Sequence, residues 1–145
     1  MKVLLQVVNH ASVSIEGNIY NEIGKGYLLF VGIGKEDNEE IVKQMATKIS
    51  KLRVCEDENG KTNLDIFAIN GKILSISQFT LYANTNGGNR PDFLNAASRE
   101  KAINLYSLFN EELREKSLVV KEGVFGADMK VNLENNGPFT ILLEI

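Results

Sequence analysis

The chain has 145 residues, of which 43% are hydrophobic and 24% charged, and its formal net charge is -3. These values are typical of one soluble domain, residues 1–145, and they lack the basic excess usual in nucleic-acid-binding domains. A single His and a single Cys exclude an intrachain disulfide and a zinc site with several such ligands.

The apolar stretches are short. None approaches the roughly 20 residues that span a bilayer, so we expect no membrane partner. The apolar run near the N-terminus is too short for the usual core of a signal peptide. With the single cysteine, Cys55, this predicts a reducing, cytoplasmic location.

The first part of the chain predicts strands. Residues 2–9 are rich in Val and Leu and predict the first one. Val13 to Ile23 predicts two short strands around a Gly17-Asn18 turn, since Gly-Asn is a common hairpin pair. Tyr27 to Ile33 is entirely apolar apart from its glycine, which predicts a buried strand.

Two amphipathic helices are predicted. Asp37 is a good N-cap, with Glu40 as capping-box partner, for a first helix that ends near Arg53. Ser98 is a natural N-cap for a second helix that ends near Lys116 or Ser117. Apolar residues recur at helical spacing in both: Ile41, Met45, Ile49 and Leu52, then Ala102, Leu105, Tyr106, Phe109 and Leu113.

Between the helices, Lys72 to Phe79 predicts a central strand that carries Ser77-Gln78-Phe79-Thr80 at its end. Asn84 to Pro91 is polar and glycine-rich, which predicts an exposed loop.

After the second helix, Leu118 to Lys121 and Val124 to Leu133 predict strands, and Asn135 to Gly137 predicts a turn before a last strand, Pro138 to Ile145. The order of elements predicts an α+β fold, in which two helices cover part of a largely antiparallel, barrel-like sheet.

Candidate catalytic residues are few. His10 could act as a base, but a lone His near a strand end is more often structural. Cys55 needs an activating partner to be a nucleophile, and a small buried strand residue is the simpler interpretation. Asp65 and Asp128 form a carboxylate pair only if the fold brings them together. Gly24-Lys25-Gly26 lacks the spacing of a phosphate-binding loop.

Two polar stretches stand out. In a strand, Gln78 and Thr80 share a face, where an amide and a hydroxyl can bind a carbonyl or an oxyanion. Thr80 could be a nucleophile, but no His is nearby to activate it. The alternative is a strand end whose polar groups are simply satisfied. Asn136-Gly137-Pro138 has the composition of a hairpin turn, and its Gly-Pro unit also offers rigid backbone carbonyls.

Segments along the whole chain resemble the D-aminoacyl-tRNA deacylase family. They occur in the family's order and spacing: Gln6-Val7-Val8, Ala11-Ser12-Val13, Ser77 to Leu81, Arg90 to Phe93, Ala97-Ser98, Phe125 to Met129, and Asn135 to Thr140.

The resemblance implies a homodimer with an active site at the subunit interface and with no cofactor and no metal. It assigns a catalytic segment to one subunit and a Gly-Pro unit with a cis bond to the other. The carbonyls of this Gly-Pro unit exclude L-aminoacyl groups, whereas D-aminoacyl groups and glycine fit. The residues implied are Ser77, Gln78, Phe79 and Thr80 for catalysis, and Gly137, Pro138, Phe125 and Met129 for substrate binding and selectivity.

The implied reaction is hydrolysis of the ester that joins a D-amino acid to the 3′-adenosine of tRNA. Phe79 would supply an N–H for the oxyanion and Gln78 would place the substrate, with the terminal 2′-hydroxyl assisting; the other proposal makes Thr80 the nucleophile. Family members often carry an arginine at the position of Val7, held to anchor the Gly-Pro loop, so this chain departs from that pattern.

Two other functions stay open: a non-catalytic RNA-binding or editing-like module of the same fold, and a dimeric scaffold. The retained catalytic and Gly-Pro segments favour the enzyme. Candidate tRNA contacts are Lys61, Arg90, Arg99, Lys101 and Lys130.

Overall fold

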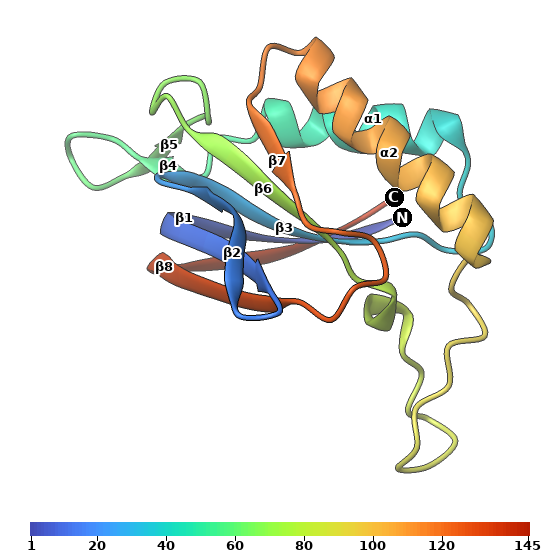
Figure 1. Ribbon diagram of the computed structural model, residues 1–145. Coiled ribbons are helices and arrows are strands. Elements are labelled where there is room, and N and C mark those ends of the chain that lie inside the picture. Colours follow the sequence, from blue (N-terminus) through green and yellow to red (C-terminus); the bar gives the residue numbers. More distant parts are fainter.

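The computed structural model describes all residues, 1–145, and confirms the predicted α+β class. Two long helices and a curved sheet account for most of the chain (Figure 1). The elements are β1 (Lys2–Ile15), β2 (Asn18–Ile23), β3 (Gly26–Gly32), α1 (Glu39–Ser50), β4 (Cys55–Glu56), β5 (Thr62–Leu64), β6 (Lys72–Ser77), the 3-10 helix η1 (Phe79–Tyr82), α2 (Arg99–Glu115), β7 (Val120–Glu122) and β8 (Lys130–Glu144).

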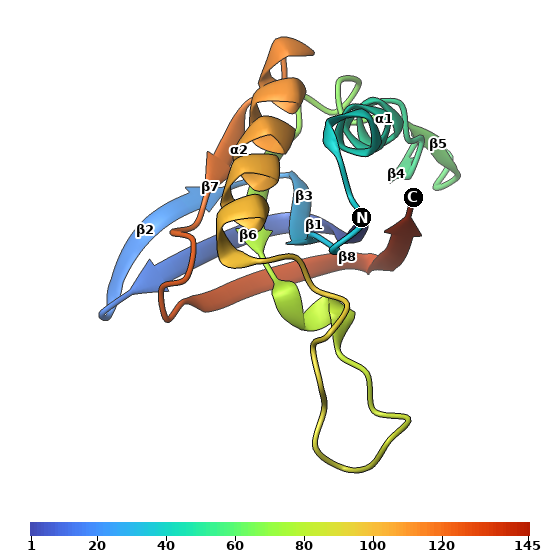
Figure 2. The ribbon, with the colours of Figure 1, turned by 90° about the vertical axis from the view of Figure 1, so that its right-hand side faces the viewer.

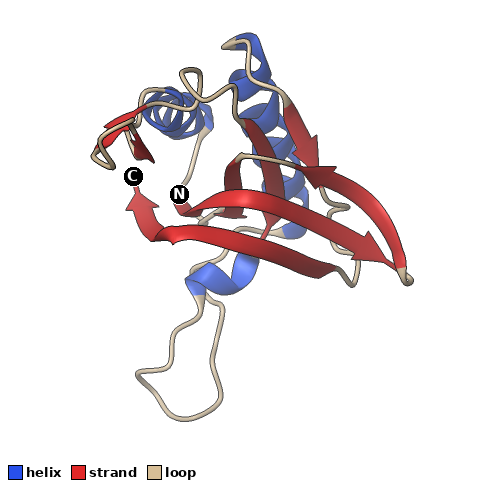
Figure 3. Cartoon of the chain, turned by 90° about the vertical axis from the view of Figure 1, so that its left-hand side faces the viewer, coloured by secondary structure: helices blue, strands red, loops and turns tan.

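Strand β1 is the centre of a six-stranded, largely antiparallel sheet. It pairs antiparallel with β2, β3 and β8, whereas β6 runs parallel to both β3 and β7. The sheet curls strongly (Figure 3). The side-chain amide of Asn21 in β2 donates a hydrogen bond of 2.7 Å to the carbonyl oxygen of Glu122 in β7, so one edge bends back toward the other. This closure gives the predicted barrel-like core.

Both helices cover the same face of the sheet (Figure 2). Their apolar stripes bury Met45, Ile49 and Phe109 completely against the strand residues Leu5 and Leu29. The helical spacing of apolar residues in the sequence therefore predicted this layer correctly. No helix combines the length and apolarity needed to cross a membrane.

The first helix begins one residue later than predicted. Asn38 is its N-cap, and its side-chain oxygen accepts a hydrogen bond from the backbone N–H of Ile41 at 3.0 Å. Asp37 is buried instead, and its carboxylate accepts from the N-terminal ammonium of Met1 and from the backbone N–H of Gly34, both at 2.6 Å. The predicted capping box with Glu40 is therefore wrong, because Asp37 has partners outside the helix.

The second N-cap, Ser98, is confirmed: its hydroxyl accepts from the N–H of Lys101 at 3.4 Å. Helix α2 ends at Glu115, close to the expected position, while α1 ends at Ser50, earlier than Arg53. The predicted Gly17-Asn18 turn is displaced by one residue, since Glu16 and Gly17 carry the positive φ angles of 50° and 80°.

The C-terminal part differs most from expectation. Residues 124–129, predicted as strand, form a loop, and β8 begins only at Lys130. The predicted turn at Asn135 to Gly137 is a bulge inside β8, because pairing with β1 resumes on both sides of it. The peptide bond between Gly137 and Pro138 is cis.

The central strand β6 also ends earlier than predicted, at Ser77. The backbone then turns into η1, and a long exposed segment, residues 84–95, projects away from the sheet before α2 (Figure 1). The exposed loop predicted for Asn84 to Pro91 is therefore confirmed.

Candidate active site

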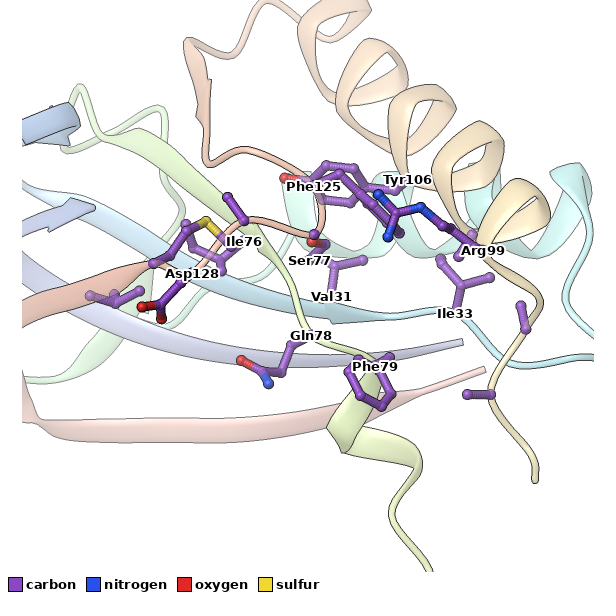
Figure 4. A pocket seen from close by; sticks show the side chains of 17 residues that line it. Val31, Ile33, Ile76, Ser77, Gln78, Phe79, Arg99, Tyr106, Phe125 and Asp128 are labelled. Atoms are coloured by element: carbon purple, nitrogen blue, oxygen red, sulfur yellow. The ribbon is translucent and has the colours of Figure 1, made fainter. Parts of the chain in front are cut away.

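The main cavity has a volume of about 560 Å³ and opens beside the end of β6. Its walls come from three parts of the chain: the ends of β3 and β6, the first turns of α2, and the loop before β8 (Figure 4). Most of the lining is apolar. The apolar wall includes Val31, Ile33, Ile76, Ala97, Ala102, Tyr106, Phe125 and Met129.

The segment Ser77 to Thr80 turns at the mouth of this cavity. Ser77, Gln78 and Phe79 line it, whereas Thr80 does not. The backbone N–H of Gln78 still bonds to the carbonyl oxygen of Val31 at 2.8 Å, which ties the turn to β3. Because η1 begins at Phe79, the directions of the Gln78 and Thr80 side chains are set by this turn and not by strand alternation. The Gln78 amide donates a hydrogen bond to the Thr80 hydroxyl.

Phe79 stands out from the surface with 58% of its area exposed. Its ring packs edge-on against Phe93, with 4.9 Å between the ring centres. Phe79 is also the first residue of η1, a position whose backbone N–H has no acceptor within the helical turn. This N–H is therefore a candidate donor to a bound ligand.

The loop before β8 supplies a second wall. All residues from Phe125 to Met129 line the cavity. Gly126 adopts a φ of +77°, and a Cβ there would lie 2.9 Å from a guanidinium nitrogen of Arg99. The same guanidinium lies 5.8 Å from the ring centre of Phe125 (Figure 4). Arg99 thus places a positive charge at the cavity edge, and its role as a tRNA contact stays a prediction.

Two titratable side chains of the cavity, Asp128 and Tyr106, have polar partners in the chain. The Asp128 carboxylate is exposed and pairs with the ammonium of Lys130 at 2.9 Å. Burial raises the pKa of Tyr106 to about 12, so its hydroxyl stays protonated at neutral pH and donates to the carbonyl oxygen of Ser75 at 2.9 Å. The site therefore offers hydrogen-bond donors and an apolar pocket, with Asp128 as its only carboxylate.

The other candidate groups lie elsewhere. The exposed His10 ring is 3.2 Å from the carboxylate of Glu22, and it does not line the cavity. Cys55 is buried beside Tyr27, and burial raises the pKa of its thiol. Asp65 accepts a hydrogen bond from the N–H of Ala68 and does not meet Asp128 in the cavity lining. No three His, Cys, Asp or Glu side chains come together as ligands for a metal ion.

Gly137 and Pro138 are exposed on the bulge of β8 and do not line the cavity of their own chain. The structure therefore brings together Ser77, Gln78, Phe79, Phe125 and Met129, and leaves the Gly-Pro unit and Thr80 outside. The sequence reasoning missed the walls from β3 and α2, because residues such as Val31 and Ala102 carry the same signal as core residues.

Comparison with known proteins gives consistent matches. The family model described as D-Tyr-tRNA(Tyr) deacylase matches residues 4–144. A D-aminoacyl-tRNA deacylase of Lactobacillus acidophilus is 52% identical, with all of both chains covered. One of Limosilactobacillus reuteri is 54% identical, with 99% of each chain covered.

Solved structures agree. The c-Myc DNA Unwinding Element Binding Protein superposes with a TM-score of 0.94 at 41% identity and covers 100% of this chain and 99% of its own. A probable eukaryotic D-amino acid tRNA deacylase, at 16% identity and 99% and 98% coverage, shares the fold with a TM-score of 0.86. The chain therefore belongs to the D-Tyr-tRNA(Tyr) deacylase family, and the enzyme class predicted from the sequence, a D-aminoacyl-tRNA deacylase, is confirmed.

Proposed function

We propose that this chain hydrolyses the ester bond between a D-amino acid and the 3′-terminal adenosine of tRNA, and releases the free amino acid and the tRNA. The observation that carries the proposal is the apolar cavity with Gln78 and Phe79 at its mouth. The backbone N–H of Phe79 has no acceptor within the helical turn that it begins. Such a site can bind an aromatic or aliphatic group and stabilise the oxyanion of an acyl transfer.

The cavity is completed by a second copy of the chain. Gly137 and Pro138 are exposed and lie outside the cavity of their own subunit, so a partner is needed to bring them to the ester. The sheet face opposite the helices supports such a contact, because Leu142 is 51% exposed there beside the half-buried Leu4. We therefore propose a homodimer with two sites, each built from the Ser77–Thr80 segment of one subunit and the Gly137–Pro138 unit of the other.

Selectivity follows from backbone groups. A Gly-Pro unit carries its carbonyls without a reactive side chain. Placed against the α-carbon, these carbonyls conflict with the side chain of an L-aminoacyl group, whereas a D-aminoacyl group or glycine fits. This is rejection by steric conflict, which discriminates without improving the contacts to the accepted substrate. Hydrolysis of mischarged glycyl-tRNA is the expected secondary activity.

The only carboxylate that lines the cavity is Asp128, which is paired with Lys130, and the proposed mechanism does not use it as a base. Phe79 N–H stabilises the developing oxyanion, and Gln78 positions the aminoacyl group. The 2′-hydroxyl of the terminal ribose, adjacent to the ester, assists the attack of water. An enzyme with this role in translation quality control meets its substrate in the cytoplasm.

Deacylation of matched D- and L-aminoacyl-tRNA tests the proposal. Purified protein is mixed with D-tyrosyl-tRNA and L-tyrosyl-tRNA, and the acylated fraction is followed over time. We expect rapid loss of the D-ester and stability of the L-ester. Release from neither substrate would overturn the enzyme assignment, and equal release from both would overturn the chiral selectivity.

One observation favours a second candidate, nucleic-acid binding without hydrolysis: the solved structure at 41% identity is named for binding a DNA unwinding element. Under this alternative the chain would bind D-aminoacyl-tRNA in a filter or mobility-shift assay and leave the ester intact. Release of the amino acid at catalytic concentrations of protein would exclude it as the main function.

A further inference from the structure

The bulge in β8 is bounded by two pairs with β1. Gln6 pairs with Thr140 and Val8 pairs with Asn135, so residues 136–139 stand opposite Val7 alone. We call residues 136–139 the Gly-Pro bulge. Its conformation cannot come from regular ladder bonds, because one residue of β1 cannot pair with all of it.

One side chain closes this bulge. The side-chain oxygen of Asn135 accepts a hydrogen bond from the backbone N–H of Phe139 at 2.6 Å, and its amide nitrogen donates to the hydroxyl of Thr140 at 2.8 Å. The amide of Gln6 in β1 donates to the same hydroxyl at 3.2 Å. Asn135, Thr140 and Gln6 together form what we call the asparagine clasp.

Nothing else holds the bulge through a polar side chain. Asn136 is exposed, and its side chain makes no hydrogen bond. Gly137 has no side chain, and Pro138 has no N–H to donate. Val7, opposite the bulge, is apolar and only 5% exposed, so it contributes packing alone. The half-buried ring of Phe139 packs on the main core and anchors the far end.

From this geometry we infer that Asn135 is a positioning residue for substrate selectivity. It acts through the N–H of Phe139 and the hydroxyl of Thr140, and so sets where the backbone carbonyls of the Gly-Pro bulge stand. The inference rests on the proposed function. Steric rejection depends on these carbonyls being fixed to within a fraction of an ångström, because a shift of about 1 Å relieves a clash or misaligns a contact.

The inference separates two effects. Loosening the clasp should leave Gln78 and Phe79 in place, since they belong to a different segment and line the cavity. Hydrolysis of the D-ester should therefore persist while rejection of the L-ester weakens. A purely structural role for Asn135 would instead lower both rates together, through loss of folded or dimeric protein.

The test is Asn135→Ala in the full-length protein, with deacylation of D- and L-tyrosyl-tRNA measured in parallel. We expect the ratio of D to L rates to fall by about tenfold or more, mainly through faster release from the L-ester, because the clasp comprises more than one hydrogen bond. Asn135→Asp keeps an acceptor for the Phe139 N–H and should restore most of the ratio. Thr140→Val removes the hydroxyl that accepts from Asn135 and Gln6, but it keeps the hydrogen bond from the Phe139 N–H to Asn135. This variant should give an intermediate ratio.

Asn132→Ala is the matched control. Asn132 lies on the same strand, is exposed, pairs with Ser12, and its side chain makes no hydrogen bond. It should behave as wild type. Hydrogen exchange of the Phe139 amide gives a second measurement that does not depend on activity, and it should accelerate in Asn135→Ala and not in Asn132→Ala.

Each outcome decides between the claims. If folded Asn135→Ala has the same ratio of D to L rates as the wild type, the inference is overturned. The proposed function is still supported in that case, provided that the wild-type protein hydrolyses the D-ester selectively. Equal loss of both rates, or unchanged Phe139 exchange, would also overturn the inference. Wild-type protein that does not discriminate would overturn the proposed selectivity and this inference together.

Discussion

The side-chain amide of Gln78 donates a hydrogen bond to the hydroxyl of Thr80. A hydroxyl that is to act as a nucleophile must give up its proton to an acceptor. Here the neighbouring group is a donor, and it occupies a lone pair of the oxygen that would attack. Thr80 also lies outside the cavity lining. The arrangement favours a role in which Thr80 orients Gln78, rather than one in which Thr80 forms an acyl-enzyme.

Thr80→Ala is therefore expected to keep substantial activity. Loss of one exposed hydrogen bond should reduce the rate of D-tyrosyl-tRNA deacylation by about tenfold at most, measured under single-turnover conditions. Thr80→Ser, which retains the acceptor oxygen, should be close to wild type. Activity at the background rate in a folded Thr80→Ala protein would restore the nucleophile mechanism.

The proposed assistance by the terminal 2′-hydroxyl leads to a prediction about the substrate. Asp128 is the only carboxylate that lines the cavity, and it is paired with Lys130, while the hydroxyl of Tyr106 stays protonated. tRNA that ends in 2′-deoxyadenosine, aminoacylated at the 3′ position, should be hydrolysed far more slowly than the natural substrate. Binding should be nearly unchanged, as competition by uncharged tRNA would show. Unimpaired turnover of the deoxy substrate would reject assistance by the 2′-hydroxyl.

Gly26 and Gly24 give a matched pair for stability. A Cβ on Gly26 would overlap the backbone of Lys72, its partner in the parallel pairing of β3 with β6, and its φ is +150°. Gly26→Ala should therefore cost about 3 kcal/mol of unfolding free energy. Gly24 has open space around its Cβ position, and Gly24→Ala should stay within about 0.5 kcal/mol.

Urea unfolding monitored by circular dichroism measures both variants. The comparison also tests the role of the glycine at position 26. We expect that this glycine is needed for the packing of β3 on β6, and not for binding a phosphate group. If Gly26→Ala and Gly24→Ala unfold at the same urea concentration, the close approach of β3 to β6 is not what requires glycine there.

Local signals in the sequence were enough for the helices and the early strands. The apolar spacing of Met45 and Ile49 and the cap at Ser98 each depend on a few neighbouring residues, and both are confirmed. Asp37 was misassigned because its carboxylate binds the Met1 ammonium, which the fold brings to it from the start of the first strand, and the N–H of nearby Gly34, instead of the helix end.

The site was harder to predict, for the same reason. The Ser77–Phe79 segment was found through its polar residues, but its direction depends on a turn that alternation cannot reveal. The bulge around Gly137 was predicted as a turn, because a bulge differs from a turn only in what the flanking residues pair with, and that partner is β1 at the other end of the chain.

Cys55 gives a prediction for pH and thiol chemistry. Burial raises the pKa of its thiol above the ordinary value of 9.0, and the thiol donates to the hydroxyl of Tyr27, 3.7 Å away. Because the folded chain holds this proton more tightly than the unfolded chain, the contribution to stability is complete below pH 9.0 and is lost as the pH rises above it. Urea midpoints should fall as the pH rises above 9.0, and less steeply in Cys55→Ala.

The same burial predicts low reactivity. The thiolate is the nucleophile in alkylation, so iodoacetamide at pH 8 should label the folded protein much more slowly than the urea-unfolded protein. Labelling is read by mass spectrometry, with unfolded protein as the control for complete reaction. Equal labelling rates in the two states would show that Cys55 is reached by solvent in the native fold, and would remove the basis for the expected loss of stability above pH 9.0.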